Sequence, residues 1–429
     1  FRNIRQLPPG TVLEWREDGT IHETLLSDAA STSASENVLG TLEESIKMHF
    51  TAEVEVGAYL SGGLDSALIA SLGRDSGHPE LRTFTLDVGD DPNESRNAAR
   101  TAELLGVKNL LGNSNTDLNE ILPRLIWHLE VPKVNALQVN QLARHAAQHV
   151  KVVLSGVGGD ELFLGYNAHR IMYFYDKAHS LLPTSISRPI GNFGAGISGS
   201  LRKVVWSETE RAAHMFAALG NWPRVYGLMR NIWDSPKLRQ MIYGPRMLDA
   251  NLPDAFASLQ EAWPQGSDPV MAMAGFEWRN KMVNDLLWQE DRASMAEGLE
   301  VRVPFVDTRV VDHVWALGRE RLMPGGKRKG YMRSMLEDVL PTEVLMRPKS
   351  GFQVDSPVFF NRYLKPLAQT WLSEDRIKEY GLFNPAFVQR VLQYGAHTGL
   401  RWHYFILYLM LTTHIWLDIF EQKSCTPVN

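Results

Sequence analysis

Residues 59–72, with the sequence YLSGGLDSALIASL, decide the fold that we expect for this chain. A β-rich run, VEVGAYL (54–60), stops at a Ser-Gly-Gly sequence, and an apolar pattern with helical spacing follows as far as Gly73. A strand, a glycine-rich loop and a helix are therefore predicted in that order. In parallel α/β sheets such loops lie at the carboxyl ends of the strands, where ligands bind.

The residues of this loop suit a phosphate. Gly62 and Gly63 let the backbone turn tightly and approach an anion, and the helix that follows points its free N–H groups at the same place. Ser61 and Ser66 add hydroxyl donors. Asp65 would repel a phosphate, but it suits a Mg²⁺ ion that accompanies one. No Gly-Lys-Ser/Thr follows, so the loop is not a Walker motif. The plainer alternative is a glycine-rich turn that caps a helix.

The chain around this loop alternates between β-rich runs and helical patterns. Strands are expected at 81–88, 107–111 and 150–156, and helices at 38–50, 94–106, 117–130 and 137–149. This alternation predicts an α/β fold whose parallel sheet, covered by helices, occupies residues 37–165. Residues 166–429 are predicted to be mostly helical, with a Gly/Ser-rich loop at 186–200.

A second loop has the same sequence features as the first. The predicted strand at 150–154 leads into SGVGGDELFLGY (155–166), where glycines again precede an acid. Asp160 is the candidate for a second Mg²⁺ ligand opposite Asp65. Glu161 is either a supporting residue behind the metal ligands or an acid favoured at a helix N-terminus. A second helix-capping turn is again the plainer alternative.

Four motifs occur in the order found in one family. They are SGGLDS (61–66), SGVGGDE (155–161), EDRASMAEGLEVRVPFVD (290–307) and RPKSGF (347–352). With these motifs the chain resembles the synthetase part of the glutamine-hydrolysing asparagine synthetases, whose nucleotide-binding loop is a PP-loop. The resemblance implies a parallel sheet of the adenine-nucleotide α-hydrolase type. It also implies a carbon–nitrogen ligase that uses ATP and Mg²⁺ and releases pyrophosphate and AMP.

The family activates a carboxylate as an acyl-adenylate, which ammonia or an amine then converts to an amide. Aspartate and ammonia are the default substrates, with asparagine as the product. The resemblance implies catalytic roles for Lys349, Asp65 and Asp160, with the two aspartates also holding the metal. It implies an ATP and pyrophosphate site made by Leu60, Ser61, Gly62, Gly63, Asp65, Ser66, Thr85, Ser155 and Gly156.

Lysine suits the role implied for Lys349, because negative charge develops on the transferring group and needs a fixed positive charge nearby. The alternative is an exposed loop lysine. Charged residues in the third motif either brace the site as buried ion pairs or contact the substrate, and we favour bracing. They are Asp291, Arg292, Glu300 and Arg302. The basic segment GGKRKGYMR (325–333) is interpreted as a solvated loop before a helix.

Two departures from the family pattern bear on function. The single cysteine, Cys425, lies near the C-terminus, so no glutaminase nucleophile is present in this chain. Residues 1–27 nevertheless resemble the last strands of a glutaminase domain. We therefore expect a remnant of that domain at 1–27, a linker at 28–36 and the synthetase domain at 37–429, with a separate glutaminase domain or chain as one expected partner. Val157 stands where asparagine synthetases usually carry an acid, and valine cannot move a proton.

Composition narrows the partners. The net charge of −5 and the lack of a long basic run argue against nucleic acid. Arg401, His403, His414 and Asp418 interrupt the apolar stretch at 401–420, which predicts a buried helix rather than a membrane span. One cysteine fits a reducing compartment, so a cytoplasmic location is expected. A homodimer is left open.

Three rival functions also stay open. The first is a specialised ligase for a small-molecule or peptide carboxylate, such as a β-lactam or lasso-peptide cyclase. The second is another PP-loop enzyme, either a tRNA thiolase or an NAD synthetase. The third is a synthetase-like scaffold without activity.

Overall fold

The computed structural model describes residues 4–26, 37–78, 80–87, 92–113, 117–133, 136–200, 208–232, 235–266, 268–348, 360–394 and 401–422. Within these ranges, five parallel strands form one sheet in the order β5-β4-β3-β6-β7. The strands are β3 (Val56–Tyr59), β4 (Arg82–Asp87), β5 (Lys108–Asn113), β6 (Val152–Leu154) and β7 (Glu300–Arg302). The predicted α/β class is confirmed.

The sheet reverses its strand order between β3 and β6. From β3 the chain adds β4 and β5 on one side, and then returns to place β6 on the other side of β3. The helices that make these crossovers are α2 (Leu64–Asp75), α3 (Pro92–Leu105), α4 (Leu118–Leu129) and α5 (Ala136–Ala147). At such a reversal the two following loops diverge and leave a crevice at the carboxyl ends of the strands.

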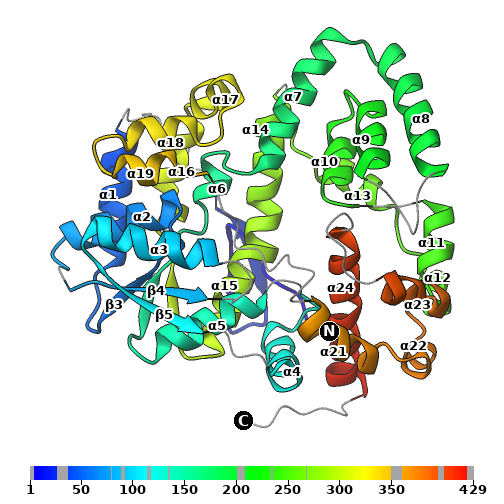
Figure 1. The fold of residues 1–429 in the computed structure, drawn as a ribbon, viewed down its shortest axis with the longest axis horizontal. Coiled ribbons are helices and arrows are strands. Elements are labelled where there is room, and N and C mark those ends of the chain that lie inside the picture. The colour runs from blue at the N-terminus through cyan, green and yellow to red at the C-terminus, as the bar shows by residue number, and fades with distance from the viewer. Residues whose placement is uncertain are drawn as a thin grey trace.

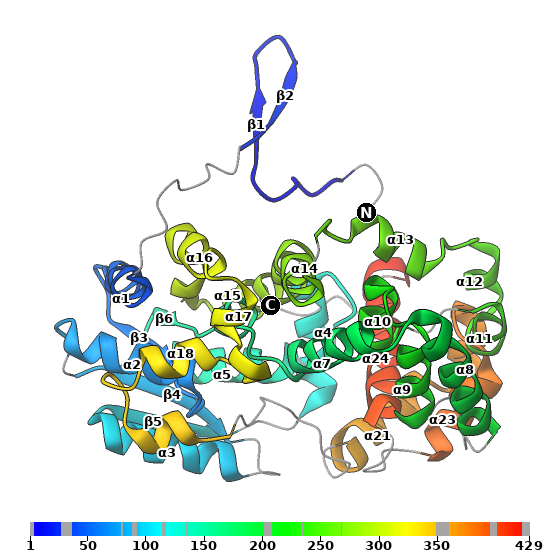
Figure 2. The same ribbon diagram turned by 90° about the horizontal axis from the view of Figure 1, so that it is seen from above.

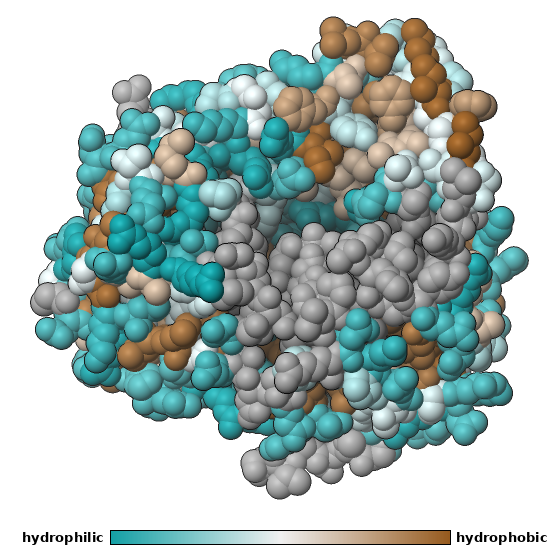
Figure 3. Space-filling view, in the orientation of Figure 1, coloured by the Kyte–Doolittle hydropathy of each residue, from teal (hydrophilic) through white to brown (hydrophobic). Residues whose placement is uncertain are grey.

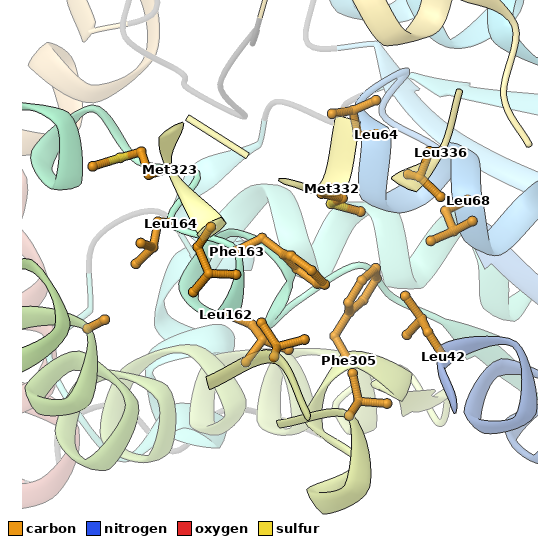
Figure 4. Packing of buried hydrophobic residues seen from close by; sticks show 14 of the residues in the cluster. Leu42, Leu64, Leu68, Leu162, Phe163, Leu164, Phe305, Met323, Met332 and Leu336 are labelled. Carbon is orange, nitrogen blue, oxygen red and sulfur yellow. The ribbon is translucent and has the colours of Figure 1, made fainter. Parts of the chain in front are cut away.

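Both faces of the sheet are buried, which explains why its strands read as short apolar runs. Tyr59 and Val153 pack on one face with α5, whereas Ala58 and Leu154 point to the other face, as the two-residue period of a strand requires. Helices α2 and α3 cover that second face, and α1 (Val38–His49) and α18 (Gly330–Met335) pack in the same core. There Leu42, Leu68, Phe163, Phe305 and Met332 converge from distant segments of the chain (Figure 4).

The strand β7 lies inside the third sequence motif and was not predicted. Its three residues pair in parallel with β6, with Val152 opposite Glu300 and Leu154 opposite Arg302. Two of its residues are charged, so no apolar run marks it. Its pairing partner, rather than its own sequence, makes it a strand.

The second half of the chain is largely helical, as expected (Figure 1). A central helix runs through α14 (Pro269–Phe276), the π-helical segment η1 (Glu277–Leu287) and α15 (Trp288–Met295). The other described helices of this half are α6 (Gly159–Leu162), α7 (Asn167–Leu181), α8 (Thr184–Ser200), α9 (Glu208–Ala217), α10 (Trp222–Met229), α11 (Pro236–Ile242), α12 (Pro245–Asp249), α13 (Ala255–Ala262), α16 (Thr308–Trp315), α17 (Gly318–Leu322), α19 (Thr342–Met346), α21 (Lys365–Trp371), α22 (Glu374–Tyr380), α23 (Pro385–Tyr394) and α24 (Arg401–Leu417). Short 3₁₀ or π turns lie at Pro304–Val306, Pro324–Gly326, Phe360–Leu364 and Asp418–Gln422.

The C-terminal helix α24 packs in a second hydrophobic core with α4, α21 and α23, where Leu407, Leu411 and Ile415 are fully buried. This burial agrees with the interpretation of 401–420 as a core helix. Among the described helices, none combines the length and apolarity needed to cross a membrane.

The Gly/Ser-rich stretch at 186–200 was predicted to be a loop, and this prediction is wrong: it forms most of α8. A Cβ atom on Gly191 would lie 2.5 Å from the Ala217 nitrogen and 2.7 Å from the Ala213 oxygen of α9. The glycine therefore lets two helix backbones approach closely, and tertiary packing overrides its low helix propensity. Ile190, Phe193 and Ile197 leave apolar surface exposed over this helix (Figure 3).

The predicted N-terminal β-segment forms a hairpin of β1 (Thr11–Trp15) and β2 (Ile21–Leu25), closed by a turn at Asp18 and Gly19. Figure 2 shows it standing away from the helices, and its side chains are largely exposed. The linker predicted at 28–36 lies outside the described residues.

Two glycines of α8 provide a matched test of its packing. Gly196→Ala places a methyl group in open space and should raise the free energy of unfolding by about 0.5–1 kcal/mol, the helix-propensity gain. Gly191→Ala forces α8 away from α9 and should lower the free energy of unfolding by about 1–3 kcal/mol. Denaturant unfolding measures both changes. Stabilisation by both substitutions would show that α8 and α9 are not in close contact.

Candidate functional site

The loops that follow β3 and β6 meet at the point where the sheet reverses. Gly62 adopts a φ of +73°, and a Cβ atom there would lie 2.8 Å from the Asn97 carbonyl carbon of α3. Glycine is therefore required twice over, by conformation and by space. The hydroxyl of Ser66 donates to the Gly63 oxygen at 3.2 Å and accepts from the Ser61 N–H at 3.2 Å. These bonds hold the loop closed in front of α2.

The predicted residues behind the loop are structural neighbours of it. Leu60 is buried, and its N–H donates to the Phe84 oxygen of β4 at 2.9 Å. The buried Thr85 hydroxyl donates to the Leu60 oxygen at 2.6 Å. On the other side, the N–H of Ser155 donates to the Arg302 oxygen of β7 at 2.8 Å. Leu60 and Thr85 connect the first loop to β4, and Ser155 connects the second loop to β7.

Glycines of the second loop make room for Asp65. A Cβ atom on Gly156 would lie 2.9 Å from the Asp65 Cβ, and one on Gly159 would lie 2.5 Å from its Oδ1. Gly158 turns the chain with a φ of +99° so that α6 begins directly beside α2. This close approach brings the Asp160 carboxylate, at the start of α6, next to that of Asp65.

Lys329 joins the two carboxylates. Its Nζ atom lies 2.6 and 2.5 Å from the two Asp65 carboxylate oxygens and 2.8 Å from Asp160 Oδ1. Burial alone would lower the pKa of Lys329, but Asp160 and Asp65 raise it above its usual value, so the amine is an ammonium ion. The residue is only 6% exposed. The sequence interpretation of 325–333 as a solvated loop is therefore wrong at this position.

A cavity of about 610 Å³ opens in front of these charges. The phosphate-loop residues 61–65 form one wall, and α7 and the 325–333 segment form others. Cations predominate among the charged residues around it, namely Arg170, Lys327, Arg328, Lys329, Arg333 and Arg347. This charge and size suit a phosphate-bearing ligand.

Arg347, at the start of the fourth motif, holds the phosphate loop in place. One of its guanidinium nitrogens donates to the Gly62 oxygen at 2.9 Å, to the Asn97 oxygen at 3.0 Å and to the Thr101 hydroxyl at 2.7 Å. It thereby joins the loop to α3. Lys349, the lysine to which the sequence assigned a catalytic role, lies outside the described residues.

The charged residues of the third motif contact structure around the sheet. Arg292 pairs with Glu130 at 3.0 Å and lies over the Trp288 ring. Arg302 pairs with Glu300 at 2.7 Å and donates to the His49 and Thr51 oxygens. Asp291 is exposed. These contacts support the bracing interpretation for the two arginines.

Glu161 turns away from Asp160 into a buried network. It accepts a hydrogen bond from the Tyr166 hydroxyl and lies 3.5 Å from Lys281 Nζ, on the π-helical segment. Within the described residues, the two site aspartates have no third acid or histidine close enough to form a metal cluster. Two carboxylates fit Mg²⁺, which usually takes one or two carboxylates together with substrate phosphates.

Sequence reasoning missed Glu290, a buried acid in the third motif. Burial raises its pKa to about 7, although a hydrogen bond with the Ser155 side chain opposes the rise. A carboxyl with a raised pKa is therefore linked to a predicted site residue. No local pattern marks this acid, because its burial depends on α15 packing against the sheet.

Comparison with known proteins gives one consistent result. The family model described as asparagine synthase matches residues 37–418. A Mycobacterium tuberculosis protein, whose name assigns it provisionally to the glutamine-hydrolyzing asparagine synthetases, is 31% identical over 399 residues. That match covers 91% of this chain and 59% of the relative.

Two further relatives carry different names. Asparagine synthetase (glutamine-hydrolyzing) 1 of Bacillus subtilis is 27% identical, over 86% of this chain and 58% of its own length. Amidase chyE of Penicillium rubens is 27% identical, over 64% of this chain and 44% of its own. The chain thus spans less than two thirds of the length of the curated relatives that it matches.

The buried carboxyl of Glu290 predicts a pH dependence of stability. Between about pH 4.5 and 7 the unfolded chain has released a proton that the folded protein keeps, so the free energy of unfolding falls as the pH rises. The fall amounts to about 3 kcal/mol across this window. Glu290→Gln should remove it and stabilise the protein at pH 8, as urea unfolding at several pH values would measure. The exposed Glu337, changed to Gln, is the control, and equal pH profiles for both variants would contradict the assignment.

Proposed function

The chain belongs to the asparagine synthase family, and from this premise we propose that it is an ATP-dependent amide ligase. It activates a carboxylate as an acyl-adenylate with release of pyrophosphate, and then transfers the acyl group to ammonia or an amine. The observation that carries the proposal is the pair of carboxylates, Asp65 and Asp160, joined by Lys329 at the mouth of a basic cavity.

The phosphate loop and the residues that line the cavity are proposed to bind different parts of ATP. Ser61 lines the same cavity wall as Asp65, whereas Ser66 is buried behind it. The N–H groups at the start of α2 and the hydroxyls of Ser61 and Ser66 are proposed to bind the departing pyrophosphate. Arg328 and Arg333 line the cavity and neutralise charge that grows on the leaving group. Leu60, Thr85, Ser155 and Gly156 are proposed to lie beside the nucleoside end.

Asp65 and Asp160 are the proposed Mg²⁺ ligands, since carboxylate oxygens are the ligands that this ion prefers. The ion, when bound, would neutralise phosphate charge and fix the direction of the departing pyrophosphate. Lys349 keeps the catalytic role proposed for it from the family motif, at the transferring phosphate. Glu161, Arg292, Glu300 and Arg302 are proposed to support the site rather than to contact substrate.

Aspartate and ammonia are the proposed substrates, with asparagine as the product. A specialised ligase for another small-molecule or peptide carboxylate is the second candidate, because Val157 is a half-buried apolar residue directly beside Ser155. An apolar side chain cannot accept a proton from the attacking nitrogen. We further propose that a separate glutaminase domain or chain supplies the ammonia. The protein is also proposed to form a homodimer and to work in the cytoplasm.

ATP–pyrophosphate exchange with Mg²⁺ across a panel of carboxylates tests the proposal. Exchange with aspartate, and asparagine formation when ammonia is added, would support the default substrates. Exchange only with another acid would favour the specialised ligase. Absence of exchange with every acid, both alone and with a glutaminase partner, would favour a scaffold without activity.

Two variants test the assignment of Asp65 as a metal ligand. Asp65→Asn should lower the exchange rate by about 100-fold or more, because the charge that balances the metal is lost. Asp75→Asn, at the exposed far end of the same helix, is the matched control and should exchange at the wild-type rate. Near-normal exchange by Asp65→Asn would reject the role of this carboxylate.

A further inference from the structure

Lys329 lies where a divalent cation would lie between Asp65 and Asp160. Three carboxylate oxygens from two different loops surround one Nζ atom at 2.5–2.8 Å. We propose that Lys329 occupies the metal position in the nucleotide-free protein, and that Mg²⁺ enters only when a nucleotide phosphate is present to receive the displaced amine. This inference rests on the proposed function for the identity of the ligand.

The amine and the metal cannot share this position. Mg²⁺ draws oxygen ligands to about 2.0–2.1 Å, so it would need the same carboxylate oxygens that now surround Nζ. The surroundings leave little space for both cations. A Cβ atom on Gly165 would overlap Asp160 Oδ1 and lie 2.5 Å from Lys329 Cε, and one on Gly159 would meet Asp65. The backbone thus encloses the charge cluster on two sides.

Charge balance determines which cation stays. Two carboxylates and one ammonium group sum to −1, so Lys329 neutralises half of the acidic charge and keeps both aspartates in place. Adding Mg²⁺ without moving the amine would place two cations within a few ångströms and give a sum of +1. Phosphate oxygens in the adjacent cavity would accept the amine and also complete the ligands of the metal, since two carboxylates alone are few for Mg²⁺.

The backbone that carries Lys329 contains three residues in the left-handed region. Lys329 itself has a φ of +51°, a left-handed conformation that is unfavourable for a non-glycine residue. Gly325 and Gly326, four and three residues earlier, have φ values of +59° and +78°. The ion pairs hold this conformation. Exchange of those ion pairs for a phosphate would free the segment to relax.

Mn²⁺ binding followed by electron paramagnetic resonance, without nucleotide, tests the exchange. Lys329→Met should bind Mn²⁺ at least ten-fold more tightly than the wild type, because the ammonium group that competes with the metal for both carboxylates is removed. Lys327→Met makes the same change of charge at an exposed lysine that lines the same cavity, and should change Mn²⁺ affinity far less. Equal affinities of the two variants would overturn the proposal.

The wild-type protein gives a second measurement, which does not depend on a variant that folds. Added pyrophosphate should tighten Mn²⁺ binding strongly in the wild type and much less in Lys329→Met. Tight Mn²⁺ binding by the wild type without any phosphate would also overturn the inference. Neither measurement needs turnover, so failure of the exchange reaction with every acid would count against the proposed function and leave this inference standing.

Discussion

The neighbouring positions of β3 and β6 are the constraint on which the site depends. Because these strands lie side by side and parallel, the loops after them leave the sheet at the same edge, although 90 or so residues of chain separate them. Asp65 and Asp160 thereby come within reach of one ammonium group. Two like charges in this position would repel each other strongly without a cation between them, and Lys329 supplies that cation.

Several glycines serve that single approach. Gly62 lacks the Cβ atom that would collide with α3, and Gly156 and Gly159 lack the Cβ atoms that would collide with Asp65. The two loops can therefore touch without side chains between them. The same closeness buries the Lys329 ammonium group, and burial strengthens its electrostatic interaction with the two carboxylates. Lys329, between the two aspartates, keeps a left-handed backbone, and burial raises the pKa of Glu290 to about 7.

The helical half of the chain supplies support and charge. Burial alone would raise the pKa of Glu277, but His169 and Arg230 lower it to about 2, so an ionised acid links the π-helical segment to α7 and α10. That network fixes the helix whose Arg170 and Phe174 line the cavity. A long π-helical segment at such a junction agrees with the tendency of these segments to lie at functional sites.

The sequence by itself determined the class of fold, the positions of the four main strands along the chain and the two loops of the site. These features depend on residues that are close together in the sequence. They are the spacing of apolar residues, the glycines at tight turns and the aspartate that follows the glycines in each loop. Only the tertiary structure decided that 300–302 is a strand, that 186–200 is a helix and that Lys329 is buried between two aspartates. Strand pairing, close helix contact and charge pairing over 264 residues of sequence separation are set by packing, and packing leaves no local signal in the chain.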